Sequence, residues 1–282
     1  MFTLSSNNIT GPDYPALLLD IGNTSTVVGY AEGGTIRFTF RIPTHAPDTY
    51  KNDGISLISR RKSSVYSSLI RQQLARHRIS PETIRAAALA SVVPAVTERI
   101  IEALQDLIGI TPLIVSCHTD TGLVLDVDRP ETVGTDLIVG AYAAACLYGT
   151  PVIIVDMGTA TTFAAVSNDR HYLGHCILPG IGISLQAMLD KTAQLPDITL
   201  TEPHHVLGKN TPDAMNNGIL YSSAAMIDGM IERISRECGF DISVTITATG
   251  GLSCMVVPLC SHTIIHDECL ILKGLLSLLA NA

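Results

Sequence analysis

Short apolar runs separated by polar turns recur along the chain and predict a mixed α/β protein. Residues 17–30 and 153–166 each read as a buried strand that passes through Asp-x-Gly into a second, β-branched run. A third strand is expected after each pair, over Thr35–Ile42 and His171–Ile177. The pattern therefore predicts two β-hairpins, each extended by one further strand.

Helical periodicity fills the segments that follow these strands. The further predicted elements are a helix within Ser59–Arg78, a strand over Ala86–Ser91, helices over Pro94–Leu107, Val133–Leu147 and Thr211–Cys238, and a strand over Ser243–Thr247. Pro94 suits the first position of its helix. The turn cluster Tyr148–Pro151 marks a boundary, so we predict an N-terminal lobe over residues 1–149 and a C-terminal lobe over 150–282.

The two strand-turn-strand segments are copies of one unit. The positions that match at an offset of 136 residues are Asp20 with Asp156, Gly22 with Gly158, Thr26 with Thr162, and Pro43 with Pro179. A duplicated lobe accounts for a length of 282 residues, close to twice a common domain size.

Composition and charge narrow the classes of partner. Hydrophobic residues make up 46% of the chain and charged residues 16%, which is typical of a globular protein. The formal net charge of −8 disfavours nucleic acids and anionic membrane surfaces as partners. Phosphate binding would therefore depend on local backbone amides, hydroxyls and bound metal ions.

Cysteine usage and the chain ends favour a cytoplasmic protein. Seven cysteines without a C-x-x-C pair favour reduced thiols over a disulfide framework. The first fifteen residues lack the basic and apolar regions of a secretory signal. The apolar run 269–280 is interrupted by Lys273 and is shorter than the ~20 residues that span a bilayer.

The repeated Asp-x-Gly turn has the chemistry of a phosphate site. Glycine lets the backbone approach a phosphate, hydroxyls and amides donate to its oxygens, and an Asp at a strand end can hold Mg²⁺. A third glycine turn lies within Ala248–Ser253. Two facing turns would form a nucleotide clamp, whereas the alternative interpretation is a pair of ordinary hairpin turns.

An ordered set of motifs covers nearly the whole chain and resembles the type III pantothenate kinase family. The motifs are Asp20–Thr24, Ser91–Pro94, Gly134–Asp136, Asp156–Thr162, Leu178–Gly180, Gly208–Thr211 and Leu270–Leu275. The resemblance implies an α/β fold of duplicated ribonuclease-H-like lobes, as in the actin-like ATPase superfamily of acetate kinase, sugar kinases, Hsp70 and actin. It also implies ATP-dependent phosphorylation of pantothenate, the first step of coenzyme A biosynthesis.

The same resemblance implies roles for individual residues. The implied ATP contacts are Asp20, Ile21, Gly22, Asn23, Thr24, Ser25, Thr26 and Val27 of a first phosphate loop, with Thr159 of a second. Asp156 would bind a monovalent cation, K⁺ or NH₄⁺, and Mg²⁺ would accompany ATP. Asp136 would be the general base, the substrate contacts would be Gly134, Thr135, Asp136, Leu137 and Thr211, and the protein would be a homodimer.

Several positions depart from the family pattern around the acceptor site. The departures are Leu137 in place of Arg, Gly140 in place of Asn, Val127 in place of Tyr, Ala164 in place of Asp, and Gly174-His175 in place of Gly-Gly. Three functions stay open: a pantothenate kinase, a catalytically impaired relative that acts as an ATP-binding regulatory module, and a kinase for another small alcohol.

Two further patterns favour ordinary structural roles. Gly208–Thr211 ends like a P-loop, but Pro203 stands where the first glycine of that motif is needed. The set of Cys254, Cys260, His262, His266 and Cys269 matches no common zinc spacing. We expect core thiols and surface histidines there, and a solvated His204-His205 pair.

Overall fold

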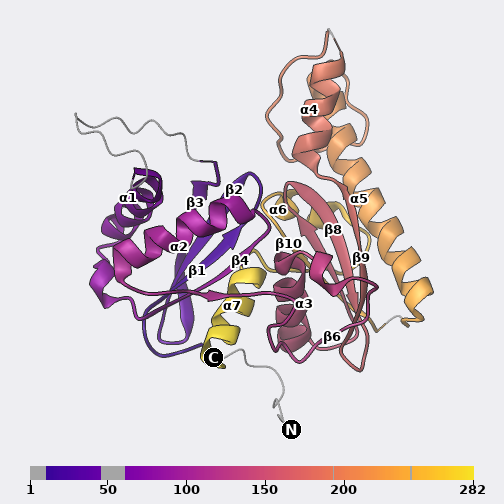
Figure 1. Ribbon diagram of the computed structural model, residues 1–282. Coiled ribbons are helices and arrows are strands. Elements are labelled where there is room, and N and C mark those ends of the chain that lie inside the picture. The colour runs from indigo at the N-terminus through magenta and orange to yellow at the C-terminus, as the bar shows by residue number, and fades with distance from the viewer. Residues whose placement is uncertain (1–10, 46–60, 193, 242) are drawn as a thin grey trace. The chain divides into compact units, whose positions relative to one another are not determined.

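The computed structural model describes residues 11–45, 61–192, 194–241 and 243–282. They form two compact units, each described by itself below (Figure 1). The first unit runs to Thr121 and adds Glu131–Ala143 and Ile271–Ala282, and the second comprises Gly122–Pro130 and Ala144–Leu270.

The strands are β1 (Ala16–Ile21), β2 (Ser25–Glu32), β3 (Thr35–Pro43), β4 (Ala86–Ser91), β5 (Leu113–Ile114), β6 (Val124–Leu125), β7 (Val152–Met157), β8 (Ala160–Val166), β9 (His171–Pro179), β10 (Thr245–Thr249) and β11 (Ile265–His266). The helices are α1 (Arg61–Arg76), α2 (Pro94–Ile108), α3 (Thr135–Tyr148), α4 (Ile181–Lys191), α5 (Thr211–Cys238), α6 (Ser253–Val256) and α7 (Leu270–Ala280). The range Ser59–Arg78, within which a helix was predicted, includes residues 59 and 60, which lie outside the described residues. Within the described part of that range the helix is α1.

The first unit contains a mixed sheet in the order β3-β2-β1-β4-β5. β1 pairs antiparallel with β2 and parallel with β4, and its near-continuous apolar run suits a central strand. Helices α1 and α2 cover one face of this sheet, where Tyr66, Ile70 and Ile100 pack into the core (Figure 1). Gly109 ends α2 in the left-handed conformation, at φ 69°, as is common at helix ends.

The last helix, α7, packs in the first unit although it ends the sequence. Gly274 of α7 lies so close to Val139 and Ala143 that a Cβ would collide with the Val139 side chain. The Tyr142 and Ser277 hydroxyls are hydrogen-bonded at 2.7 Å. The packing units therefore differ from the predicted linear division at 149/150, because an apolar helix from the chain end completes the core of the first unit.

The second unit repeats the plan of the first. Its sheet has the order β11-β10-β7-β8-β9-β6, of which the first five strands match the order in the first unit. β7 and β9 begin and end 136 residues after β1 and β3. A β-bulge interrupts the second hairpin pairing in each copy, at Tyr30/Ala31 and at Ala165/Val166. The duplicated lobe predicted from the sequence is confirmed.

Helix α5 covers one face of the second sheet, together with α6 (Figure 1). It spans Thr211–Cys238, as predicted, and buries Leu220, Ile227 and Ile231. The following strand β10 lies two residues later than predicted, because it pairs in parallel with β7 from Thr245 opposite Val152. Among the described residues, no helix has both the length and the apolar character that crossing a bilayer requires.

Candidate functional site

The first phosphate-loop candidate joins β1 to β2 and is held by a buried hydroxyl. The Thr44 hydroxyl donates to the Gly22 carbonyl oxygen at 2.6 Å, and the Thr26 Oγ1 lies 3.0 Å from Thr44 Oγ1. Because the proton of Thr44 is used on Gly22, Thr26 is the donor in that second bond. Asn23 and Thr24 are exposed at the tip of the turn. The loop is therefore fixed from within and presents its tip outward.

Two residues beside this loop were missed by sequence reasoning. The Thr44 amide also donates to the Thr24 carbonyl oxygen at 3.3 Å, and the Thr44 carbonyl oxygen accepts a bond from the Tyr66 hydroxyl at 2.5 Å. Arg41 donates from Nη1 to the Ser25 hydroxyl at 3.4 Å, which places a cation beside the loop. Thr44 follows the repeated Pro43, but its counterpart at the offset of 136 is Gly180, so the repeat gave no signal for it.

The acceptor-motif candidate begins helix α3 and is tied to the end of β4. The Thr135 hydroxyl accepts a bond from the Ser91 amide at 2.8 Å and donates to the Ser91 carbonyl at 3.0 Å. The Val92 amide in turn donates to the carbonyl of Ile21, the last residue of β1, at 3.2 Å. The carboxyl ends of β1 and β4 thus bring the first loop and the start of α3 to one edge of the sheet, where α/β folds commonly bind ligands.

The Asp136 carboxylate lies folded over the backbone of this motif. Its Oδ1 accepts a bond from the Leu137 amide at 2.8 Å. A Cβ at Gly134 would collide with the same Oδ1, so glycine at 134 leaves the carboxylate its place. Asp136 is half-buried in the first turn of α3, where the helix dipole favours a negative charge.

The second loop candidate joins β7 to β8, and two glycine turns pack against it. Gly250 has φ 95°, and a Cβ there would lie 2.6 Å from both Asp156 Oδ1 and the Met157 amide nitrogen. A Cβ at Gly180 would collide with the carbonyl oxygens of Gly158 and Thr159. The structure therefore gathers Asp156, the exposed Gly158-Thr159 turn and the Gly250 turn in one place.

The Gly250 turn is held by two consecutive hydrogen bonds that involve the side chains of Ser253 and His266. Ser253 is fully buried, and its hydroxyl donates to the Gly250 carbonyl at 2.5 Å. His266 Nε2 lies 2.7 Å from the same hydroxyl oxygen. Because the Ser253 proton is used on Gly250, the imidazole is the donor to Ser253. The glycine turn is thus connected through Ser253 to strand β11.

The oxygen donors fit the cations that ATP chemistry needs. Asp20 and Asp156 are half-buried at the ends of equivalent strands. Mg²⁺ is commonly held by one or two carboxylates together with phosphate oxygens, and backbone carbonyl oxygens like those of Gly158 and Thr159 can coordinate K⁺. Within residues 11–45, 61–192, 194–241 and 243–282, no group of three or more His, Cys, Asp or Glu side chains is placed to hold a metal ion.

Thr211 begins α5 in the second unit and is exposed. The residues before it form a helix cap: the Asn210 side chain accepts the Asp213 amide at 2.9 Å and donates to the Asp213 carboxylate at 2.7 Å. A Cβ at Gly208 would collide with the backbone of Ala214. The Gly208–Thr211 sequence thus caps a helix, and Thr211 belongs to a different unit from Asp136.

Members of the zinc alternative have other partners, and Cys254 is exposed, whereas a core thiol was expected there. His262 Nδ1 lies 2.9 Å from the Asp228 carboxylate. Burial raises the pKa of that carboxyl group, but hydrogen bonds from His262 and Ser261 outweigh burial, and the net pKa is lowered. Burial, and then the nearby Asp228 charge, raise the pKa of the Cys260 thiol to about 12. His204 and His205 are exposed.

Comparison with known proteins adds a family and a fold. A model of the type III pantothenate kinase family matches residues 16–233. MreB 5 of Spiroplasma citri bound to AMPPNP has a TM-score of 0.53 at 9% identity, covering 93% of this chain and 95% of that chain. The ethanolamine utilization protein EutJ from Carboxydothermus hydrogenoformans has a TM-score of 0.51 at 13% identity, covering 98% and 92%.

A third solved structure has the same architecture. Component A of the (R)-2-hydroxyglutaryl-CoA dehydratase of Acidaminococcus fermentans has a TM-score of 0.50 at 13% identity, covering 95% of this chain and 97% of that chain. At these identities the likenesses show the fold alone. The fold is that of the actin-like ATPase superfamily, as predicted.

Proposed function

The chain belongs to the type III pantothenate kinase family, and from that premise we propose that it transfers the γ-phosphoryl group of ATP to the primary hydroxyl of pantothenate. The product would be 4′-phosphopantothenate, the first intermediate of coenzyme A biosynthesis. The family match supports a kinase, and the identity of the acceptor is the part of the proposal that experiment must decide.

One observation carries the proposal. Thr135 ties the start of α3 to Ser91, and Val92 ties the end of β4 to the end of β1, so the acceptor motif and the first phosphate loop share one sheet edge. Phosphoryl transfer is catalysed mainly by alignment and by charge neutralisation. A carboxylate held next to a phosphate loop is the arrangement that such a transfer requires.

Asp136 acts as the general base. Its carboxylate accepts the proton of the pantothenate hydroxyl as that oxygen attacks the γ-phosphorus, and ADP leaves. Gly134 and Thr135 shape the site by leaving room for the carboxylate and by fixing the start of α3. Thr211, from the second unit, is the further substrate contact that family membership suggests.

The phosphates are bound by the two loops. Asn23 and Thr24 are the exposed donors of the first loop, whereas Ile21 and Thr26 are buried and support it. Thr159 is the exposed donor of the second. Asp20 would hold Mg²⁺ on the phosphates and Asp156 the monovalent cation, and these ions supply the positive charge that a chain of net charge −8 lacks.

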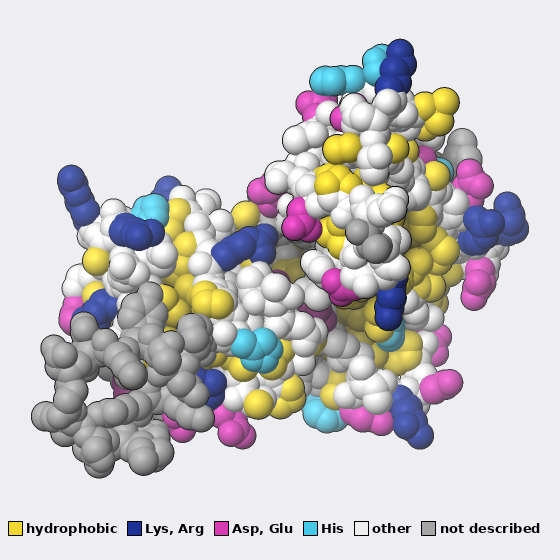
Figure 2. Space-filling view, turned by 90° about the horizontal axis from the view of Figure 1, so that it is seen from above, with side chains coloured by type: hydrophobic (Ala, Val, Ile, Leu, Met, Phe, Trp, Pro, Cys, Tyr) yellow, Lys and Arg dark blue, Asp and Glu magenta, His cyan; other side chains and the backbone are white. Residues whose placement is uncertain are grey.

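A homodimer completes the proposal. Ile177, Val206 and Leu207 are 66%, 62% and 84% exposed. Figure 2 shows hydrophobic side chains at the surface of the second unit. Contiguous exposed apolar patches are typical of surfaces that contact another protein, and we propose that these side chains contribute to such a contact. Sedimentation equilibrium of the full chain measures the association directly.

The deciding experiment is a steady-state assay that couples ADP release to pantothenate, with K⁺ and NH₄⁺ varied and Na⁺ as the control ion. We expect pantothenate-dependent ADP release, stimulated by K⁺ or NH₄⁺, and a product heavier than pantothenate by one phosphoryl group in mass spectra. Absence of pantothenate-dependent ADP above background overturns the proposed acceptor.

Asp136→Asn tests the base. The substitution keeps the shape of the side chain but removes the proton acceptor, so we expect kcat to fall about 100- to 10,000-fold. AMPPNP binding, measured by calorimetry, should stay within twofold. Glu102→Gln, an exposed carboxylate on α2, is the matched control and should leave kcat unchanged. A comparable loss in both variants would contradict a specific role for Asp136.

Leu137 favours a second candidate, a kinase for another small alcohol. Leu137 is half-buried next to Asp136 and supplies no positive charge for an acceptor carboxylate. Leu137→Arg should lower the KM for pantothenate roughly tenfold if that charge is what the site lacks. An unchanged KM, together with faster turnover of an uncharged alcohol such as pantothenyl alcohol, would favour the second candidate.

A further inference from the structure

The two units differ where the third strand of each sheet faces the end of a helix. In the first unit Phe38 of β3 fills this place. Its ring stacks on His77, just after α1, at 3.7 Å between ring centroids, and on Tyr30 at 5.2 Å and Phe40 at 6.3 Å. Four aromatic rings thus close the space between β3 and the end of α1.

The second unit has small residues at the equivalent positions. At the offset of 136 residues, the counterparts of Phe38, Tyr30 and Phe40 are Gly174, Val166 and Cys176. No ring replaces Phe38, because Gly174 has no side chain and nothing lies within 4 Å of where its Cβ would be. A pocket of about 250 Å³ opens here between β8, β9 and the last turns of α5.

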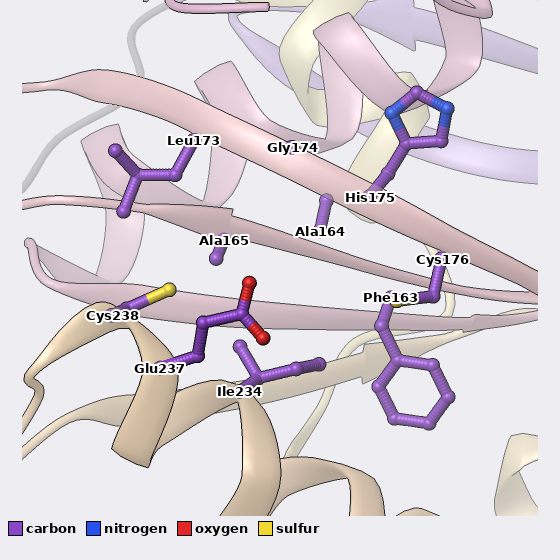
Figure 3. Close-up of a pocket in the computed structure, with 10 residues that line it drawn as sticks. All are labelled: Phe163, Ala164, Ala165, Leu173, Gly174, His175, Cys176, Ile234, Glu237 and Cys238. Atoms are coloured by element: carbon purple, nitrogen blue, oxygen red, sulfur yellow. The ribbon is translucent and has the colours of Figure 1, made fainter.

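The pocket lining mixes apolar side chains with polar groups, and the exposed Glu237 is its only acidic residue. Phe163, Ala165 and Ile234 contribute its apolar lining. Figure 3 shows the Glu237 carboxylate and the Cys238 thiol pointing from α5 toward Ala165. Burial, and then the Glu237 charge, raise the pKa of the Cys238 thiol, so that thiol stays neutral at physiological pH. The pocket therefore carries a single negative charge.

Glu237 has no cationic partner in the described parts of the chain, where no Lys, Arg or His side chain forms an ion pair with it. His175 is one of the lining residues, but its ring points away from Glu237 (Figure 3). A carboxylate beside apolar side chains such as Phe163 and Ile234 favours a ligand that joins an apolar group to a positive charge.

We propose that this pocket binds a small amphiphilic cation, with an aromatic group between the sheet and α5 and an ammonium group at Glu237. The volume is sufficient, since cavities of about 150 Å³ can hold benzene. The aromatic preference follows from the first unit, in which an aromatic ring occupies the same place on the repeated sheet. No lining residue belongs to either phosphate-loop candidate, and the proposal does not depend on the proposed kinase activity.

Three probes of similar size and different charge test the chemistry on the full chain: phenethylamine, 2-phenylethanol and phenylacetate, titrated by ligand-observed NMR. We expect the amine to bind roughly two- to fivefold more tightly than the alcohol, as befits a partly exposed ion pair, and phenylacetate to bind more weakly than either. Glu237→Gln should reduce the amine to the affinity of the alcohol and leave the alcohol unchanged.

Substitutions that fill the pocket with a larger side chain test whether the amine binds there. Cys176→Phe restores the residue type of the first unit, and Ile234→Phe fills the pocket from α5; each should weaken the amine more than tenfold. Ser222→Phe, at an exposed position of α5 outside the pocket lining, is the matched control. Circular dichroism identifies any variant that fails to fold, and the other filling variant then decides. The proposal is overturned if no probe binds at 10 mM, if phenylacetate binds best, or if a folded filling variant binds the amine like the unmodified chain.

Discussion

The two loops that join the first strands of each unit are held in place by different physical means. In the first unit the loop is fixed by hydrogen bonds, from Thr44 to the Gly22 carbonyl and from Thr26 to Thr44. In the second unit it is fixed by close backbone contact, because Gly180 and Gly250 leave no room for a side chain. Duplication preserved the topology of the lobe but not the interactions that hold its loop.

The difference predicts unequal tolerance to substitution. A hydrogen-bonded loop loses one bond when a hydroxyl is removed, whereas a loop held by glycine contact must move when a Cβ is added. The residue that follows the third strand illustrates the contrast: Thr44 in the first unit and Gly180 in the second occupy equivalent positions, 136 residues apart. The second loop should therefore be the more sensitive to small changes in size.

Gly250→Ala should have the largest effect. A Cβ there meets the Met157 backbone and Asp156, and φ 95° is strained for alanine, so we expect a loss of about 2–4 kcal/mol in the free energy of unfolding. Urea denaturation followed by circular dichroism measures it. AMPPNP affinity should fall as well, because the added methyl group displaces the Asp156 carboxylate.

The equivalent test in the first unit is Gly22→Ala, whose Cβ would lie 3.2 Å from the Ser25 carbonyl oxygen. That contact requires a shift of only a few tenths of an ångström, so we expect a change within about 1 kcal/mol. Gly182→Ala, in α4 with open space around it, is the control for alanine itself. Equal losses for Gly22→Ala and Gly250→Ala would remove the contrast between the loops.

Thr44→Val tests the hydrogen-bonded loop. Valine keeps the shape of the buried side chain but removes the bond to Gly22 and leaves Thr26 without its acceptor. We expect the free energy of unfolding to fall by about 1–3 kcal/mol and the KM for ATP to rise. Thr39→Val, exposed on the preceding strand β3, is the matched control and should be nearly neutral. A neutral Thr44→Val would mean that backbone bonds alone hold the loop.

The repeat explains why much of the fold could be predicted from the sequence. The strands around Asp20 and Asp156 combine a long apolar run with an Asp-x-Gly turn, and both signals are local. Helix α5 could be placed from its own periodicity and its Thr211 start. Local patterns of this kind carry enough information to define elements before any tertiary contact is known.

Long-range contacts explain what the sequence did not reveal. The membership of α7 in the first unit depends on Gly274 meeting Val139, which lies over a hundred residues earlier. The start of β10 is set by its register with β7, and no nearby residue signals it. The role of Thr135 was implied by family resemblance, but its bonds to Ser91 depend on the fold.

The link from His266 through Ser253 to the Gly250 carbonyl was also invisible in the sequence, and it gives the finest test of how the second unit holds its turn. Ser253→Ala leaves the glycine contacts intact and removes only this link, so we expect a loss of about 0.5–1.5 kcal/mol in the free energy of unfolding and a two- to tenfold rise in the KM for ATP.

Removing the imidazole by His266→Ala should give a smaller loss, because Ser253 keeps its bond to Gly250. In the double variant the two losses should be less than additive, since both substitutions remove the same bond. His204→Ala, exposed in a loop, is the control. Strict additivity would show that His266 and Ser253 act separately, and backbone contact at Gly250 would then be enough to hold the turn.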